Sequence, residues 1–370
     1  MDYSTTTVVG LDVSKDWLAA GALFPHAQQV TELAKLPNDI KNLSRYVKRL
    51  GSTWPLVFVY EAGPCGFDLF RQITAMGHRC VVIAPSLMPK KPGDRVKTDR
   101  RDAEKLARYY RSGDLTEIRV PTTHEEAARD LVRAREAAVA DRLAAAHRVQ
   151  KYLLRFGRLY QGGRNWSRGH REWLGAQRFE EHSAELAFKA HVRALEEAEA
   201  RLGGLSQHVL DLAQQEAYAT GVKHLRALKG IDTLSAITLL TEVMDFRRFS
   251  KAREIMGYTG MVPSEHTTNF TPRRGRITKT GNAHIRRILV EAAWQYQRKG
   301  ALSRCLSERR RDCPSEVLEI AKKADDRLHR RFWRLSQKGV LRTKVAVAVA
   351  RELSGFVWAI GVKTAELVAA

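Results

Sequence analysis

The feature that most constrains the fold is a change of pattern near residue 118 of the 370-residue chain. Up to about residue 115 the chain contains short runs rich in β-branched and aromatic residues, "TVVGLDVS", "DWLAAGALF", "QQVTELAKL", "LVFVYEAG" and "CVVIAP". Such runs are typical of strands. The first three predict a short meander, and helical patterns near 39–50, 67–76 and 98–112 alternate with the later ones. This order predicts a mixed-sheet α/β domain over residues 1–118.

Beyond residue 118 the apolar residues recur at helical intervals. We predict a helical coiled-coil arm over residues 119–221, beginning with "EEAARDLVRAREAAVADRLAAAHRVQKYLLRF" and interrupted by the basic, Trp-containing loop "GGRNWSRGHREW". Such an arm could dimerise, hold nucleic acid or serve as a plain helical linker. The same helical spacing of apolar residues predicts a mainly helical C-terminal domain over residues 222–370.

Two stretches of this C-terminal domain suggest contacts to phosphate. "LRALKGIDTLSAITLLTEV" carries Gly230 between two helical patterns, as in a helix-hairpin-helix, whose turn presents backbone N–H groups to phosphate. Residues 271–288 contain six Lys/Arg and no acid. We therefore predict nucleic-acid contacts at Gly230, Arg273, Arg274, Arg276, Lys279, Arg286 and Arg287, and at Lys97, Arg100 and Arg101 in the first domain.

The charge balance agrees with a polyanionic partner. The sequence has 63 Lys+Arg against 41 Asp+Glu, a formal net charge of +22, which favours nucleic acid over the alternative of a merely basic enzyme.

The four cysteines, Cys65, Cys80, Cys305 and Cys313, form no C-x-x-C pair and suggest reduced thiols. With no signal-peptide layout and no uninterrupted apolar run of membrane length, we expect a cytoplasmic, nucleoid-associated protein without a membrane partner.

Four carboxylates stand at the ends of the predicted elements of the first domain. Asp12 ends the first strand, Glu61 ends a later buried strand, and Asp99 and Asp102 begin the closing helix, where three-residue spacing puts both on one face. If the first and fourth strands are neighbours, the four acids form a bowl that requires cations. Hard oxygen ligands favour Mg²⁺ or Mn²⁺. Alternatively, each acid is a turn, loop or helix-capping residue.

These motifs carry a resemblance to a known family. "GLDVSKD", "VYEAG" and "KTDRRDAEKLA" resemble the DEDD motif of a RuvC-like, ribonuclease-H-fold domain, and "GYTGMVPSEH" with "GRITKTGNAHIRRILVEAAW" resembles the C-terminal domain of the same proteins. The family is the DEDD-type insertion-sequence transposases, related to the Piv DNA invertases and guided by a structured bridge (seeker) RNA. The resemblance implies that Asp12, Glu61, Asp99 and Asp102 bind metal. It also implies DNA and guide RNA as partners and a homodimer that assembles into a tetramer.

The same resemblance implies a nucleophile in the C-terminal domain. In the family a serine that precedes a glycine, just after "PSE", attacks DNA and forms a covalent link. Here the segment reads "PSEHTTNF", so Thr268 matches the serine and Asn269 the glycine. The β-branch of threonine restricts its rotamers, and Ser264 and Thr267 are alternative hydroxyls.

The resemblance therefore implies an RNA-guided DNA recombinase of a bacterial insertion sequence. Two alternatives stay open. One is a metal-dependent, junction-resolving nuclease that forms no covalent intermediate. The other is a non-catalytic relative that binds nucleic acid.

Overall fold

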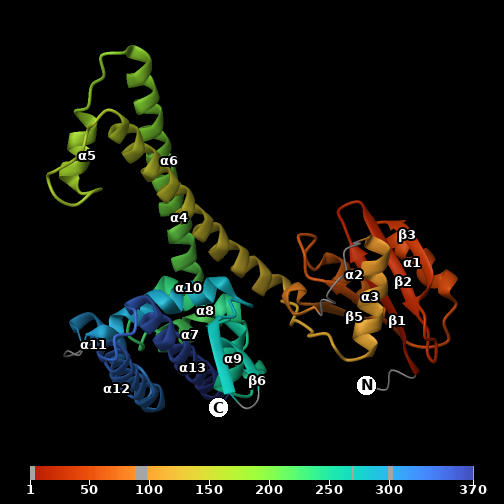
Figure 1. Cartoon of the computed structure of the whole chain (residues 1–370). Coiled ribbons are helices and arrows are strands. Elements are labelled where there is room, and N and C mark those ends of the chain that lie inside the picture. The colour runs from red at the N-terminus through yellow and green to blue at the C-terminus, as the bar shows by residue number, and fades with distance from the viewer. Residues whose placement is uncertain (1–4, 89–97, 269–270, 299–302, 370) are drawn as a thin grey trace. The chain divides into compact units, whose positions relative to one another are not determined.

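The structure is a computed structural model that describes residues 5–88, 98–268, 271–298 and 303–369 (Figure 1). The chain divides into two compact units, Met1–Pro121 and Thr122–Ala370. We call them the α/β unit and the helical unit, and each is described by itself.

The α/β unit is built on a mixed five-stranded sheet, as the sequence predicts. Its strand order is β3-β2-β1-β4-β5. The first three strands form an antiparallel meander, whereas β4 and β5 run parallel to β1. The first and fourth strands are therefore neighbours. The strands span Thr7–Val13 (β1), Trp17–Leu23 (β2), Thr31–Pro37 (β3), Leu56–Glu61 (β4) and Arg79–Ile83 (β5).

Helices cover both faces of this sheet. Residues of α1 (Ile40–Leu50) and α2 (Asp68–Ala75) share one core cluster with Val9, Leu11 and Phe58, whereas α3 (Asp99–Arg111) shares another with Val8, Val57 and Val59. Alternate residues of a strand point to opposite faces, which explains how β1 and β4 contribute to both clusters. A single 3₁₀ turn, Pro85–Leu87, follows β5.

The helical unit begins with two long helices, α4 (Thr123–Arg155) and α6 (His182–Leu212) (Figure 1). Salt bridges join Arg142 to Glu199 at 3.0 Å and Arg201 to Asp141 at 3.1 Å. Because these partners run in opposite directions along the two helices, α4 and α6 form an antiparallel hairpin. The segment interpreted as a loop contains a further helix, α5 (Arg168–Gly175).

The rest of this unit is a bundle around one core. Ala128 and Val132, near the start of α4, belong to the same core as the C-terminal helices. The arm and the C-terminal domain are therefore continuous in the structure, although the sequence suggested a boundary at residues 221/222. The bundle helices span Glu216–Leu225 (α7), Thr233–Val243 (α8), Ala252–Tyr258 (α9), Ala283–Ala293 (α10), Arg304–Arg310 (α11), Ser315–Gln337 (α12) and Arg342–Ala369 (α13), with 3₁₀ turns at Phe246–Arg248 and Trp294–Gln297.

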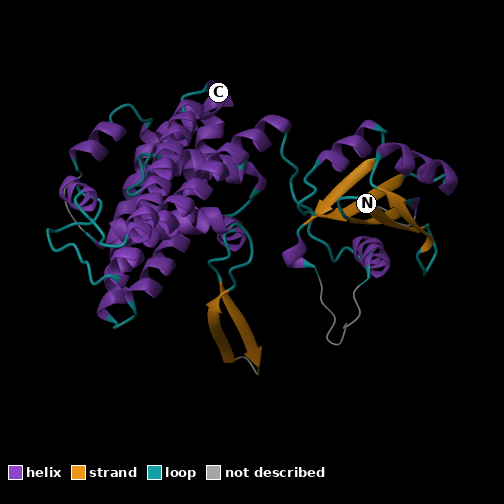
Figure 2. Cartoon of the chain, turned by 90° about the horizontal axis from the view of Figure 1, so that it is seen from above, coloured by secondary structure: helices purple, strands orange, loops and turns teal. Residues whose placement is uncertain are grey.

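A β-hairpin interrupts the bundle between α9 and α10. Its strands are β6 (Pro263–Thr268) and β7 (Thr271–Ile277), which pair antiparallel. Figure 2 shows these two strands projecting away from the helices of the unit. The sequence analysis did not predict this hairpin, because its strands carry basic and small residues instead of an apolar alternation.

Within the described residues, α13 is the one helix that is long and apolar enough to cross a membrane. Half of its most apolar stretch is buried inside the unit, and Val345, Val349 and Leu353 belong to the bundle core. Its apolar character is thus explained by packing against neighbouring helices.

Candidate active site

The register between β1 and β4 places two of the predicted acids side by side. Leu11 pairs with Tyr60 in this parallel ladder, so the next residues, Asp12 and Glu61, occupy matching positions at the same end of neighbouring strands. Side chains two residues apart share a face of a sheet. Because Val8 and Val59 pack in the cluster that contains α3, Asp12 and Glu61 face the side of the sheet that α3 covers.

Helix α3 lies very close to β1, in the opposite direction. A β-carbon on Gly10 would lie 2.1 Å from the carbonyl oxygen of Ala103, so only glycine leaves room for the helix. Val8 shares its core cluster with Leu106 and Tyr110, nearer the C-terminal end of the helix. The N-terminal turn of α3 therefore lies at the end of β1 that carries Asp12.

This turn carries the other two predicted acids. Thr98, and not Asp99, caps α3, because the Thr98 hydroxyl accepts a hydrogen bond from the backbone N–H of Arg101 at 3.4 Å. Asp99 is exposed and Asp102 is half-buried, and Asp102 Oδ1 lies 3.5 Å from Lys105 Nζ. Acidic side chains are favoured in a first helical turn, so local structure also accounts for both.

A cavity of about 350 Å³ joins the strand end to the helix start. Its walls include both Asp12 and Asp99, so these two carboxylates share one open surface. On the other side, the Nζ of Lys35 lies 4.9 Å from the centroid of the Trp17 ring, a cation–π contact. The polar and aromatic lining consists of Asp12, Ser14, Trp17, Lys35, Thr98, Asp99 and Arg100.

The backbone thus brings the four predicted acids to one end of the sheet, but their side chains do not all line the same cavity. Of the four, Asp12 and Asp99 line the cavity. Within the part of the chain that the structure describes, no three His, Cys, Asp or Glu side chains form a group that could hold a metal ion. The assignment of all four as metal ligands stays a prediction.

The predicted cations of this unit differ in their surroundings. Arg100 lines the cavity and forms an exposed ion pair with Glu104 at 3.3 Å. Arg101 is exposed, and Lys97 lies outside the described residues.

The candidate nucleophiles lie on the β6–β7 hairpin. Thr268 is the last residue of β6 and pairs through its backbone with Thr271, and Thr267 pairs with Pro272. The side chains of Thr267 and Thr268, and the whole of Asn269, lie outside what the structure describes. Ser264 stands at a bulge of β6. A β-carbon on Gly275 would lie 2.4 Å from Ser264 Oγ, so this hydroxyl lies directly over the glycine of the opposite strand.

The cations near the hairpin fall into two groups. Arg273, Arg276 and Lys279 are exposed, and Arg274 forms an exposed ion pair with Glu265 at 3.5 Å. By contrast, Arg286 donates a hydrogen bond to the carbonyl oxygen of Thr259 at 2.8 Å, and Arg287 donates to Glu136 at 2.8 Å. The structure therefore shows internal contacts for Arg286 and Arg287, which the sequence analysis interpreted as nucleic-acid contacts.

Gly230 also has a packing role. It adopts a φ of +81°, in the left-handed region that favours glycine. A β-carbon there would lie 2.7 Å from the carbonyl oxygen of Ala292 on α10. The turn between α7 and α8 therefore packs closely against α10, and this packing requires glycine independently of any contact to phosphate.

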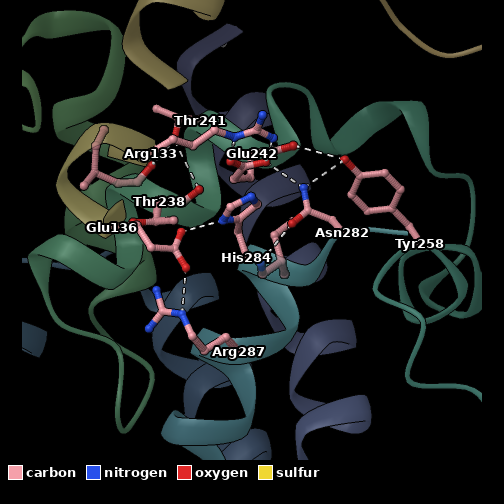
Figure 3. Close-up of polar contacts among 11 residues, drawn as sticks. Arg133, Glu136, Thr238, Thr241, Glu242, Tyr258, Asn282, His284 and Arg287 are labelled. Carbon is pink, nitrogen blue, oxygen red and sulfur yellow. Dashed lines mark hydrogen bonds and ion pairs between the residues drawn. The ribbon is translucent and has the colours of Figure 1, made fainter. Parts of the chain in front are cut away.

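The sequence analysis missed a group of paired charged residues around one buried carboxylate at the base of the arm (Figure 3). Glu242 on α8 is only 2% exposed. Arg133 on α4 donates to both of its carboxylate oxygens, at 2.7 and 2.9 Å, and the amide of Asn282 donates at 2.7 Å. Burial by itself raises the pKa of Glu242, but the hydrogen bonds from Arg133 and Asn282 outweigh it and hold the pKa below its usual value.

A second carboxylate extends this group. Nδ1 of His284 lies 2.5 Å from Glu136 Oε2, and Arg287 pairs with the other oxygen of Glu136. Burial raises the pKa of Glu136, but the His284 hydrogen bond and the Arg287 charge hold it below its usual value. We call these six residues the polar junction, namely Arg133, Glu136, Glu242, Asn282, His284 and Arg287. The signal in the sequence was Glu242 within the apolar run "AITLLTEVM".

Comparison with known proteins now defines the class. A model of DEDD transposases of the IS110 type, described as "Transposase", matches residues 9–157, which contain the four predicted acids. A second model, described as "Transposase IS116/IS110/IS902 family", matches residues 222–306, which contain the β-hairpin. Residues 158–221 lie between the two matched ranges. The class defined by these matches is the insertion-sequence transposases.

Whole-chain relatives agree with both matches. "Putative transposase y4qE" of Sinorhizobium fredii is 42% identical over 354 residues, which cover 95% of this chain and 87% of the relative. "Transposase for insertion sequence element IS1533" of Leptospira borgpetersenii is 30% identical over 334 residues, which cover 89% and 96%. The chain belongs to the IS116/IS110/IS902 family of transposases.

Proposed function

We propose that this transposase cuts and rejoins DNA with the carboxylates of a RuvC-like, ribonuclease-H-like α/β unit and a hydroxyl of the β6–β7 hairpin, guided by a structured RNA. One observation carries the proposal. The β1–β4 register places Asp12 beside Glu61, and Asp99 from the start of α3 lines the same cavity as Asp12. Three separate elements thus carry acidic residues at one end of the sheet, an arrangement that capping alone does not require.

The donor chemistry of this end suits a hard divalent cation. Carboxylate oxygens are the ligands that Mg²⁺ and Mn²⁺ prefer. Asp12 and Asp99 would hold the ion from the cavity, with Glu61 and Asp102 on the adjoining strand end and helix turn. When bound, such an ion stabilises the charge that develops on the phosphodiester oxygens.

The cations near the acids would bind the DNA backbone. Arg100 and Lys35 line the same cavity as Asp12, where they would hold the DNA phosphates on either side of the bond that is cut. The sequence also predicts phosphate contacts at Lys97 and Arg101.

The covalent step would use the hairpin. The hydroxyl oxygen of Thr268 would form a bond to phosphorus while the bond from phosphorus to a DNA oxygen breaks, and the departing oxygen takes a proton. Arg273, Arg274, Arg276 and Lys279 would stabilise the phosphate charge. Ser264, whose hydroxyl lies over Gly275, is the alternative nucleophile, and Thr267 is a third.

The partners follow from the charge and the family resemblance. A net charge of +22 suits binding to both DNA and a structured guide RNA. We propose that the chain acts as a homodimer that assembles into a tetramer in the bacterial cytoplasm, at the nucleoid and without a membrane partner.

The carboxylate assignment is tested by cleavage of a plasmid that carries the ends of the element, with guide RNA and Mg²⁺ present. Asp12→Asn and Asp99→Asn should each lower the cleavage rate by about 100-fold or more, because each removes a ligand charge. Asp16→Asn is the matched control, since Asp16 is an exposed acid four residues from Asp12. RNA affinity should stay at the wild-type value in all three. Undiminished cleavage by Asp12→Asn would remove the metal-site proposal.

The nucleophile is tested separately, by trapping protein–DNA adducts under denaturing conditions. Thr268→Ala should lose the adduct, whereas Thr267→Ala and Ser264→Ala keep it. An adduct that persists in Thr268→Ala and disappears in Ser264→Ala would transfer the role to Ser264. Metal-dependent cleavage without any adduct in the wild-type protein would favour the hydrolytic nuclease, and binding without cleavage would favour the non-catalytic relative.

A further inference from the structure

The end of the α4–α6 hairpin that carries α5 contains a cavity of about 320 Å³, and we call residues 147–178 the tip. The cavity is formed by the last turns of α4, the following loop and α5. Its walls include Lys151, Leu154, Leu159, Tyr160, His170 and Trp173. The volume is at the lower end of the range for small-ligand sites, which is enough for one planar heterocycle.

Aromatic rings form one side of this cavity. The ring centroids of Tyr160 and Trp173 are 5.5 Å apart, and those of His170 and Trp173 are 5.6 Å apart. Leucines stand nearby with much of their surface in solvent, since Leu154 is 57% and Leu159 64% exposed. An open cavity with aromatic and aliphatic walls is suited to stacking against a flat ring.

A largely buried histidine lines the same cavity. His170 is only 2% exposed, and burial lowers its pKa, so the ring is neutral near pH 7. The backbone N–H of Trp166 donates to His170 Nδ1 at 3.1 Å, which leaves the ring proton on Nε2. No described residue accepts a hydrogen bond from Nε2. This N–H is not one of the buried polar atoms that the described structure leaves without a partner, so it is reached from the cavity and can donate to an acceptor atom of a ligand.

The charge of the tip restricts what this ligand is. Residues 147–178 contain eight Lys/Arg and one acid, Glu172, and Glu172 is paired with Arg168 at 2.8 Å. Lys151 and Arg164 are exposed and form no ion pair with a described residue. A second copy of this strongly basic tip would be repelled, whereas a polyanion would be attracted.

We propose that the tip cavity binds an unpaired nucleotide of a nucleic-acid strand. The base stacks against Tyr160 and Trp173, and His170 Nε2 donates to an acceptor on the base. Lys151 and Arg164 contact the neighbouring phosphates. Aromatic surfaces surrounded by cations bind single strands in this way, whereas a paired base in a duplex cannot enter the cavity. The inference rests on the proposed nucleic-acid function but assigns it a site far from the carboxylates in the sequence.

The test uses the full-length protein with single-stranded RNA, single-stranded DNA and a blunt DNA duplex of equal length. Asn165→Trp fills the cavity from an exposed position in its wall. It should weaken single-strand binding about 10-fold, the loss expected for one stacked base, and leave duplex binding unchanged. The strand type that loses affinity identifies the source of the nucleotide.

A charge variant and a cross-link provide independent readouts. The double variant Lys151→Gln, Arg164→Gln should lower the salt dependence of single-strand binding by about 1.4 in log–log slope, whereas Arg193→Gln, an exposed arginine on α6, should lower it less. In the wild-type protein, 4-thiouridine placed at an unpaired position should cross-link to a peptide of the tip.

Two results would overturn the proposal. One is a cross-link that maps outside the tip together with unchanged single-strand affinity in Asn165→Trp. The other is a change of oligomeric state in Asn165→Trp with no change in affinity, which would make a second copy the occupant. Because Asp12→Asn should slow cleavage by about 100-fold or more and leave this binding intact, failure of the catalytic proposal and failure of the tip proposal are distinguishable.

Discussion

Two pairs of charged residues, one in each unit, have the same spacing and different surroundings. Asp99 and Asp102 stand three residues apart on α3, and Arg133 and Glu136 stand three residues apart on α4. Asp99 lines an open cavity together with Asp12. Arg133 and Glu136 instead face charges of α8 and α10, in the polar junction.

The difference shows what spacing on a helix can and cannot tell. Three-residue spacing places both side chains of a pair on one face, but the element packed against that face determines their role. Opposite α4 the chain supplies Glu242 and Arg287, so the charges of Arg133 and Glu136 are paired within the chain. Near the start of α3 it supplies Asp12, another carboxylate, with Lys35 and Arg100 in the walls of the same cavity, so these charges face an open surface.

The largest predicted difference between the two regions is in how much a substitution lowers the free energy of unfolding. Arg133→Met should lower the free energy of unfolding of the helical unit by about 3 kcal/mol, because it leaves the buried Glu242 carboxylate without its main partner. Asp12→Asn should lower stability by less than Arg133→Met, because Asp12 lines an open cavity whereas Glu242 is buried. Urea unfolding followed by circular dichroism measures both changes. Equal losses in the two variants would contradict the distinction between the regions.

A control and a pH series sharpen this prediction. Arg168→Ala breaks an exposed pair, whose arginine is 94% exposed, and should cost about 0.3–0.5 kcal/mol. The pKa of Glu242 is lowered in the folded protein, so its stabilising effect is complete above its unfolded pKa of about 4.3 and is lost as pH falls through the lower folded value. Glu242→Gln should therefore show a weaker loss of stability on acidification than the wild-type protein.

A smaller effect distinguishes the cations of the helical unit from one another. Arg273→Ala and Arg276→Ala should each weaken DNA binding and lower its log–log salt dependence by about 0.9, since each exposed arginine would neutralise one phosphate. Arg287→Ala should leave the salt dependence unchanged, because Arg287 is paired with Glu136. Filter binding between 50 and 300 mM KCl, on the order of physiological ionic strength, measures the slopes. A lower slope in Arg287→Ala would show that Arg287 contacts nucleic acid, as the sequence analysis predicted.

Much of the α/β unit could be predicted because its local patterns are strong. Strands and helices fall where the sequence placed them, with Asp12 and Glu61 at strand ends and the two aspartates in the first turn of α3. The β6–β7 hairpin could not be predicted, since its residues are polar and its stability comes from pairing across the strands. The helix α5 was hidden within a loop-like composition of Gly, Arg and Trp. Whether the four acids bind metal stays a prediction.

The sequence by itself determined the order of elements, the charge excess and the chemical types of the candidate site residues, because these depend on short-range periodicity and composition. Only the tertiary structure decided which charges face one another. It placed Asp12 beside Glu61 through the β1–β4 register and buried Glu242 against Arg133, 109 residues away along the chain. Contacts over such separations depend on packing between whole elements, and no local pattern encodes them.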